Sequence, residues 1–397
     1  MIQRTWHALG ASLLALALAL PSAAQAACAA DWPLWQGYAE RFVQQDGRML
    51  GSSMKPDQSS SEGQSYGMFF ALVANDRERF AQLWQWSQDN LAAGDTQRNL
   101  PGWLWGANEK GDWTVLDRNS ASDADLWMAY ALLEADRLWQ APHYRTAALQ
   151  LLDNLERTLV RDVPGLGRML LPGPVGYEHP DQLWRFNASY LPLPLLRYFA
   201  QTRPNGPWDD IAKSTVSMLA DPDINPYGFA PDWVAYRGDG KGKGRFGSDP
   251  FSNDIGSYDA IRVYLWAGMT PRDDRLAKRL LASLDGMAQA TATLGAPPEK
   301  VHVLTRTFDG AGFYGFSAAL VPLLKAKGLQ AAATQQQAIV EQALRDYANP
   351  ASPAYNTHQY YHLMLSLFSL GWSEKRYQFT PEGRLQLSWE HQCANKP

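Results

Sequence analysis

The chain has 397 residues and a formal net charge of -4, with 46% hydrophobic and 19% charged residues. This composition supplies enough apolar material for a large core. The charge is slightly acidic and no long basic run occurs, which argues against a nucleic-acid partner. A few cations lie between Arg237 and Arg245, but they are spread among glycines. We expect that stretch to be a loop.

The first residues resemble an export signal. Arg4 and His7 precede an apolar run over residues 8–20, and a small-x-small pattern ends at Ala26. The run is too short for a permanent membrane helix. We therefore expect residues 1–26 to be a signal peptide. The mature protein would be secreted, with the periplasm as its expected location, and would not insert into a membrane.

Two cysteines, Cys28 and Cys393, lie at opposite ends of the expected mature chain. An oxidising compartment allows them to form a disulfide, and we favour that pairing over two free thiols. Two cysteines cannot build a structural zinc site. His358 and His362 have helical i, i+4 spacing, but no nearby Glu or Cys completes a ligand set. We predict neither a metal nor a cofactor.

Aromatic residues are abundant, with 16 Trp, 17 Tyr and 14 Phe. A core absorbs many of them, but this excess also suits carbohydrate binding. The apolar faces of sugar rings pack on aromatic rings, while the hydroxyls need polar partners.

Helical periodicity recurs along the chain, and Gly, Pro, Asn and Asp fill the breaks. The expected helices are 65–75, 76–91, 123–139, 144–160, 191–201, 208–219, 258–268, 273–291, 315–326, 331–347 and 357–371. Strand signals are weak and short, at 168–171 and 377–379. No segment resembles a linker, so residues 27–397 are expected to form one domain. A closed ring of helical hairpins, an all-α α/α barrel, fits this pattern better than a four-helix bundle.

Glu62, Asp123 and Asp259 each lie near the start of an expected helix, after small or polar residues. Ser59 and Ser120 stand three positions before the first two, which is the spacing of a capping box. Any one of these acids alone is best explained as a capping residue. If the helices line a barrel, however, their N-termini converge on one mouth and bring the three acids into one cleft.

Paired carboxyl groups are the requirement of glycoside hydrolysis, in which one protonates the leaving oxygen. We predict that Glu62 is this acid and that Asp259 is the ionised base. A helix N-terminus lowers the pKa of a carboxyl group, whereas burial and a neighbouring carboxylate raise it. For Glu62 we expect burial and Asp123 to dominate.

These motifs resemble glycoside hydrolase family 8. The resemblance rests on residues 61–68 (SEGQSYGM), 121–135 (ASDADLWMAYALLEA), 186–192 (FNASYLP) and 258–262 (YDAIR). Within the family the chain is most similar to the periplasmic endoglucanases of bacterial cellulose synthesis, to which residues 229–233 (FAPDW) and 297–301 (PPEKV) also correspond.

The resemblance implies an (α/α)6 barrel with a cleft at the N-terminal ends of the inner helices. It also implies endo-acting, inverting hydrolysis of β-1,4-glucan, with Glu62 as proton donor, Asp259 as base and Asp123 at the cleaved sugar. Inversion predicts that the carboxyl groups of Glu62 and Asp259 lie about 6.5–9.5 Å apart. Association with a cellulose synthase complex would follow from the same likeness.

Further residues are expected to bind the sugar chain. Tyr258 and Arg262 flank the base, and Tyr190 lies in the aromatic segment. Trp105, in a glycine-flanked stretch, is a candidate stacking platform, and Trp103 has a similar setting.

Two alternatives remain open at this point. The same fold could act on chitosan or xylan, since the sequence does not reveal the shape of the pocket. The chain could also be a glucan-binding escort whose hydrolysis is incidental.

Overall fold

The computed structural model describes residues 30–51, 55–355, 357 and 359–390. The expected signal peptide, both cysteines and His358 lie outside the described residues. In the part of the chain that is described, no helix is both long enough and apolar enough to cross a membrane.

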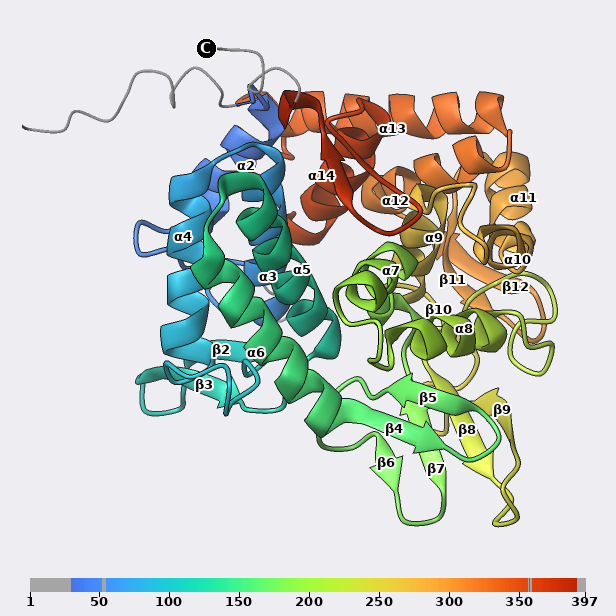
Figure 1. Ribbon diagram of the computed structural model, residues 1–397. Helices are drawn as coiled ribbons and strands as arrows, with labels where there is room; N and C mark the ends of the chain where they lie inside the picture. The colour runs from blue at the N-terminus through green and yellow to red at the C-terminus, as the bar shows by residue number, and fades with distance from the viewer. Residues whose placement is uncertain (1–29, 52–54, 356, 358, 391–397) are drawn as a thin grey trace, which may run out of the picture.

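The inner wall of the fold is a ring of buried helices (Figure 1). Its members are α3 (Ser61–Val73), α5 (Ser122–Trp139), α7 (Leu193–Thr202), α9 (Ala260–Met269), α12 (Tyr314–Ala326) and α14 (Tyr360–Ser373). Each packs against the next in this order. The ring closes between α14 and α3, where the ring of Phe368 stacks on Phe69 at 5.3 Å and meets Phe70 edge-on at 4.6 Å. Such aromatic contacts stabilise the core beyond the burial of their area.

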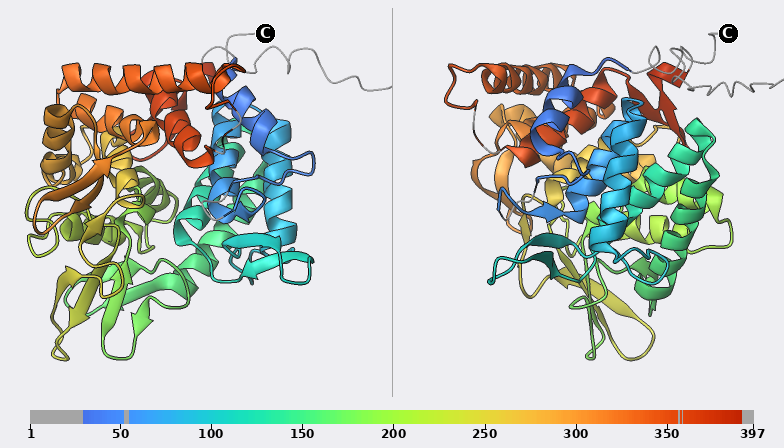
Figure 2. Two further views of the ribbon diagram at one scale, coloured as in Figure 1. Left: turned by 180° about the vertical axis from the view of Figure 1, so that it is seen from behind. Right: turned by 90° about the vertical axis from the view of Figure 1, so that its left-hand side faces the viewer.

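A second layer of helices covers this ring (Figures 1 and 2). It comprises α4 (Arg77–Trp86), α6 (Pro142–Leu159), α8 (Trp208–Leu219), α10 (Ala277–Ala282), α11 (Asp285–Leu294), α13 (Gln330–Ala348) and α2 (Pro33–Phe42). Helix α2 packs on α14, so one outer–inner helix pair of the barrel is formed by helices from the two ends of the described chain. The architecture is the expected (α/α)6 barrel.

Short antiparallel strands lead into the inner helices. Strands β2 (Leu104–Ala107) and β3 (Trp113–Asp117) form a sheet with β1 (Ser59–Ser60), which runs directly into α3. A second sheet joins β10 (Ile255–Gly256), just before α9, to β11 (Pro298–His302) and β12 (Thr307–Ala311). Strands β1 and β10 lie directly before α3 and α9 and help to fix where the two helices begin.

The largest sheet has the order β6 (Glu178–His179), β7 (Leu183–Phe186), β8 (Val234–Gly238) and β9 (Gly244–Ser248), and lies along the lower edge of Figure 1. Two smaller hairpins pair β4 (Val160–Val163) with β5 (Gly167–Leu170), and β13 (Tyr377–Phe379) with β14 (Leu385–Leu387). The two expected strands correspond to β5 and β13.

Three sequence-based expectations were wrong. The segment 273–291 is not one helix, because a break between Ala282 and Asp285 separates α10 from α11. The stretch from Arg237 to Arg245 is not a loop alone but the tip of the β8–β9 hairpin. Strand content was underestimated, because short hairpins with mixed burial carry little two-residue alternation.

Candidate active site

The N-terminal ends of α3, α5 and α9 meet around one cavity of about 270 Å³. Glu62, Asp123 and Asp259 all line it, although they come from distant parts of the chain. The other described lining residues are Ser60, Ser61, Trp103, Ala121, Tyr190, Tyr258, Arg262, Tyr361 and His362. The barrel therefore gathers the three predicted acids as the convergence argument expected.

The carboxylate of Glu62 does not cap helix α3. The N-cap of α3 is Ser60, not Ser59, and its hydroxyl accepts a hydrogen bond from the backbone N–H of Gly63 at 3.1 Å. Ser59 instead lies in β1, paired with Trp105. Because another side chain caps the helix, the Glu62 carboxylate is available to face the cavity.

Capping does not explain Asp123 either. The N-cap of α5 is Ala121, and no side chain caps that helix. Asp123 has an exposed fraction of only 2%, and its Oδ1 has no hydrogen-bond partner among the described residues. A buried carboxylate oxygen without a partner is costly, and a sugar hydroxyl or water in the cavity would satisfy it. The capping-box interpretation of Ser59 and Ser120 was wrong.

Arg262 joins the two acids assigned to proton transfer. Its Nη1 contacts Glu62 Oε2, and its Nη2 forms an ion pair with Asp259 Oδ1 at 2.7 Å. The same Nη2 donates to Ser189 Oγ at 3.2 Å. Its side chain is only 5% exposed, against 20% for Glu62 and 29% for Asp259. A buried guanidinium thus holds two carboxylates from different helices in fixed positions.

The pKa values of all three carboxyl groups are raised. Burial is the first cause each time, and Arg262 opposes it. The pKa of Asp123 reaches about 7. The charge of Asp259 contributes to the raised pKa of Glu62, and the charge of Glu62 contributes to the raised pKa of Asp123.

Charge balance favours a shared proton in this cavity. Arg262 is the one guanidinium among its described lining residues, and it faces three carboxyl groups. His362 adds no charge at neutral pH, because burial lowers its pKa to about 4. Three ionised carboxylates beside one cation would be strongly repulsive, so at least one carboxyl group retains a proton near neutrality.

The neutral side chains of Asn187 and Trp233 lower the pKa of Asp259 relative to what burial alone would give. Glu62 has a single neutral donor of this kind, the hydroxyl of Tyr360 at 3.4 Å. Burial thus raises the pKa of Glu62 and of Asp259, and Arg262 lowers both.

The expected sugar-binding residues divide into two groups. Tyr190, Tyr258 and Arg262 line the cavity, but Trp105 does not, and its neighbour Trp103 lies there instead. Trp105 stacks on Trp113 at 5.0 Å, and the guanidinium of Arg48 lies against it at 4.6 Å. These rings form an outer aromatic surface, next to the strand that precedes α3.

Sequence reasoning missed several residues of the site. Tyr360, Tyr361 and His362 begin α14, which closes the ring, and no charged motif marked them. Asn187 and Trp233 lie near the base. They belong to the motifs 186–192 and 229–233, but the sequence analysis gave neither residue a role. The rings of Tyr177 and Trp233 are stacked, with centroids 5.6 Å apart and an interplanar angle of 4°, and they add to the aromatic side chains near the base.

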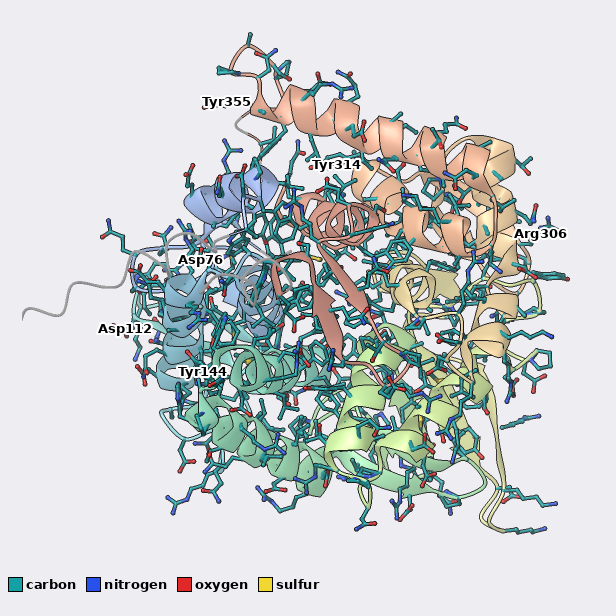
Figure 3. The ribbon with its side chains drawn as sticks, turned by 45° about the horizontal axis from the view of Figure 1, so that its top comes forward. Asp76, Asp112, Tyr144, Arg306, Tyr314 and Tyr355 are labelled. Carbon is teal, nitrogen blue, oxygen red and sulfur yellow. The ribbon has the colours of Figure 1, made fainter. Side chains whose placement is uncertain are left out.

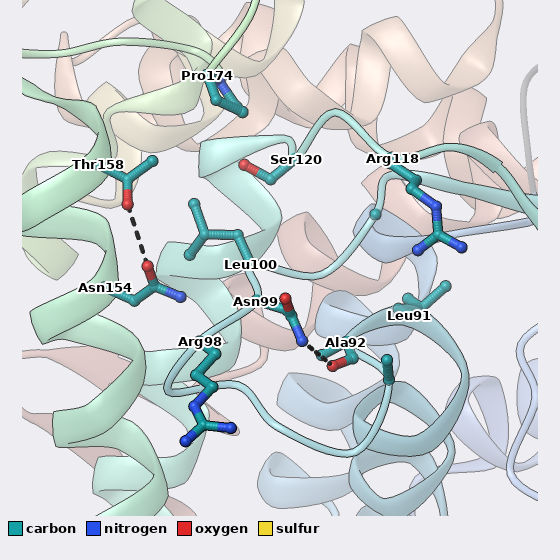
Figure 4. Close-up of a pocket in the computed structure, with 12 residues that line it drawn as sticks. Leu91, Ala92, Arg98, Asn99, Leu100, Arg118, Ser120, Asn154, Thr158 and Pro174 are labelled. Atoms are coloured by element: carbon teal, nitrogen blue, oxygen red, sulfur yellow. Dashed lines mark hydrogen bonds between the residues drawn. The ribbon is translucent and has the colours of Figure 1, made fainter.

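A second cavity of about 270 Å³ lies between α6 and the loop before α5 (Figure 4). Two hydrogen bonds join residues along its wall: Thr158 donates to Asn154 at 3.1 Å, and Asn99 donates to the carbonyl of Ala92 at 3.1 Å. None of its described lining residues is a carboxylate. The cavity around Glu62, in contrast, brings three carboxyl groups together, and it is the candidate active site.

Residues 9–375 match the family described as Glycosyl hydrolases family 8. The chain belongs to this family, as its sequence motifs suggested, and it is a glycoside hydrolase. It is 55% identical over 369 residues to an endoglucanase of Pseudomonas fluorescens (strain SBW25), covering 92% of this chain and 93% of that one. An endoglucanase of Escherichia coli (strain K12) is 42% identical over 389 residues, which are 98% of this chain and 99% of that one.

Solved structures agree with this assignment. The endo-1,4-D-glucanase of Vibrio fischeri ES114 superposes with a TM-score of 0.83 at 36% identity, covering 90% of this chain and 99% of that one. A cold-adapted family 8 xylanase shares the fold alone, with a TM-score of 0.59 at 14% identity over 88% of this chain and 90% of that one.

Proposed function

We propose that the protein is an endo-acting β-1,4-glucanase that cleaves cellulose or a related glucan with inversion at the anomeric carbon. The observation that carries this proposal is the shared contact of Glu62 and Asp259 with Arg262 in a cavity that Asp123 also lines. The relatives named endoglucanase, at 55% and 42% identity, support the substrate class.

In the proposed reaction, Glu62 transfers its proton to the glycosidic oxygen as the bond to the anomeric carbon breaks. Asp259 removes a proton from a water molecule, and that water attacks the anomeric carbon from the opposite face of the sugar. The unpartnered Oδ1 of Asp123 accepts a hydrogen bond from a sugar hydroxyl or from this water. Asp259 ends the cycle protonated and Glu62 ionised, and exchange with solvent restores both.

Aromatic rings on both sides of the acids support a sugar-chain substrate. Trp103 lines the cavity near Glu62. The rings of Tyr190 and Trp233, whose centroids are 6.0 Å apart, lie beside Asp259. Rings of this kind bind the apolar faces of pyranose units, and the carboxylates recognise the hydroxyls. A long glucan would lie across both groups, as an enzyme that cuts within the chain requires.

The site also supports catalysis over simple escort of a glucan. An escort protein gains nothing from three carboxyl groups whose pKa values are raised by burial, because that burial costs stability. From the resemblance of its sequence motifs to periplasmic endoglucanases of cellulose synthesis, we propose a periplasmic location and association with a cellulose synthase complex.

The direct test compares Glu62→Gln with the parent enzyme on carboxymethyl cellulose, xylan and chitosan. Loss of the acid should lower kcat by a factor of about 10²–10⁴ while binding of cello-oligosaccharides persists. Glu78→Gln, on the exposed face of α4, is the matched control and should leave activity unchanged. Unchanged hydrolysis by Glu62→Gln, or greater activity on xylan or chitosan than on the glucan, would contradict the proposal.

A further inference from the structure

Helix α9, which carries the proposed base, is not capped by its own first residue. Asp259 occupies the N-cap position with helical dihedrals (φ -79, ψ -51), and its carboxylate makes no capping hydrogen bond. An Asp at this position ordinarily accepts from the backbone of its own first turn. Here the carboxylate points to Arg262 and the cavity instead.

A second carboxylate performs the capping. Oδ1 of Asp232, which lies before β8, accepts hydrogen bonds from the backbone N–H groups of Ser257, Asp259 and Ala260 at 2.8, 3.1 and 2.7 Å. The backbone N–H of Asp232 in turn donates to the carbonyl of Ile255 at 2.8 Å. The segment before β8 and the start of α9 are thus bound to each other in both directions.

This arrangement separates two tasks that one side chain cannot perform at once. If Asp259 capped α9 itself, its carboxylate would be tied to backbone N–H groups and would have fewer lone pairs for water. Because Asp232 satisfies these donors, including the N–H of Asp259 itself, the backbone of the base is fixed while its carboxylate remains available.

We propose that Asp232 is a positioning residue for catalysis, which caps α9 in place of Asp259 and so holds the general base at its working position. The inference rests on the proposed function, since it takes Asp259 to be the base. Asp232 itself does not line the cavity. Small displacements of a catalytic group can cost about a hundredfold in rate, so the loss of this cap should appear in kcat.

The test compares three substitutions at Asp232. Asp232→Ala removes the acceptor and should lower kcat about tenfold to a hundredfold, with KM changed less than about twofold. Asp232→Asn keeps an acceptor oxygen and should restore kcat to within about threefold of the parent. Burial and the charge of Asp259 raise the pKa of Asp232 to about 7, so a neutral amide resembles the carboxyl group present over much of the neutral range.

The third substitution, Asp232→Ser, guards against failure of the alanine variant to fold. Its hydroxyl oxygen is one bond closer to the backbone and cannot reach all three N–H groups. Its kcat should fall between the values of the Asn and Ala variants. Equal kcat in Asp232→Ser and the parent would overturn the proposal, as would an Asn variant no better than Ala or Ser.

The matched control is Asp76, whose carboxylate caps the outer helix α4 by accepting from the N–H of Arg79 at 3.2 Å (Figure 3). Asp76→Ala should lower the melting temperature but leave kcat of the folded enzyme unchanged. If Asp232→Ala reduced only the folded fraction, as this control does, Asp232 would have no positioning role. Full activity in Asp259→Asn would instead refute the proposed function, whatever the result at Asp232.

Discussion

Arg262 forms an ion pair of 2.7 Å with Asp259, the residue one helical turn before it, while its other terminal nitrogen contacts Glu62. A contact at i, i+3 is usually a minor stabiliser on a helix surface. Here the arginine is 5% exposed and couples two helices. Its charge therefore acts on the pKa values of both groups assigned to proton transfer.

Replacing Arg262 should move the whole pH–activity profile. Arg262 lowers the pKa of both Glu62 and Asp259, so Arg262→Met should raise both values. The acid limb, set by ionisation of the base, and the alkaline limb, set by loss of the proton from the acid, should then both shift to higher pH. The rate at the optimum should also fall, by about tenfold to a hundredfold. Measuring kcat/KM between pH 4 and 9 checks this.

Arg197 offers a control of similar burial. It pairs with Asp274 at 2.6 Å, and it does not line the active-site cavity. Arg197→Met should destabilise the fold without moving either limb. An unchanged profile in Arg262→Met would mean that the guanidinium does not set the protonation of the site.

Asp123→Asn should stabilise the protein at alkaline pH while impairing catalysis. Burial raises the pKa of Asp123 from 3.8 to about 7, so the folded state binds this proton more tightly than the unfolded state does. Ionisation of Asp123 therefore lowers the free energy of unfolding as pH rises from about 4 to above 7. A neutral amide avoids that cost, and the gain at pH 8 should be on the order of 1–3 kcal/mol.

Urea unfolding at pH 8 and pH 4 measures this difference. The gain should shrink at pH 4, because the wild-type carboxyl group is then largely protonated in the folded state. Lower stability of Asp123→Asn at pH 8, or an equal change at both pH values, would contradict the assignment.

Trp105 should matter for long substrates and not for chemistry. Its ring is stacked on Trp113 outside the cavity, with Arg48 at 4.6 Å. Trp105→Ala should raise KM for a long glucan about threefold to tenfold, with little change in kcat, as expected for the loss of one aromatic contact. Steady-state kinetics on a polymer and on a short cello-oligosaccharide checks this. Equal effects on both substrates would place Trp105 outside the path of the chain.

Much of the barrel could be predicted from periodicity, because its helices bury long apolar stretches. Helices 123–139 and 208–219 were placed within one residue of α5 and α8. The hairpins could not be predicted in this way, since their strands are short and partly exposed. The break within 273–291 was missed because the apolar pattern continues through it.

The acids of the site could be predicted from their shared position near helix starts, together with the family resemblance. The residues that surround these acids could not be predicted in this way. Which residue caps a helix depends on backbone geometry, and neither Ser60 nor Asp232 was identified from sequence. The residues of α14 that line the cavity, Tyr361 and His362, reach it only because the ring closes, which local sequence does not encode.

The anomeric configuration of the first product tests the central claim most directly. Proton NMR of a cello-oligosaccharide digest, recorded before mutarotation is complete, distinguishes the two anomers at the newly formed reducing end. If Glu62 is the acid and Asp259 activates water, the α-anomer should appear first, because the water attacks opposite to the leaving group. Initial formation of the β-anomer would require a covalent intermediate on the enzyme and would contradict these roles.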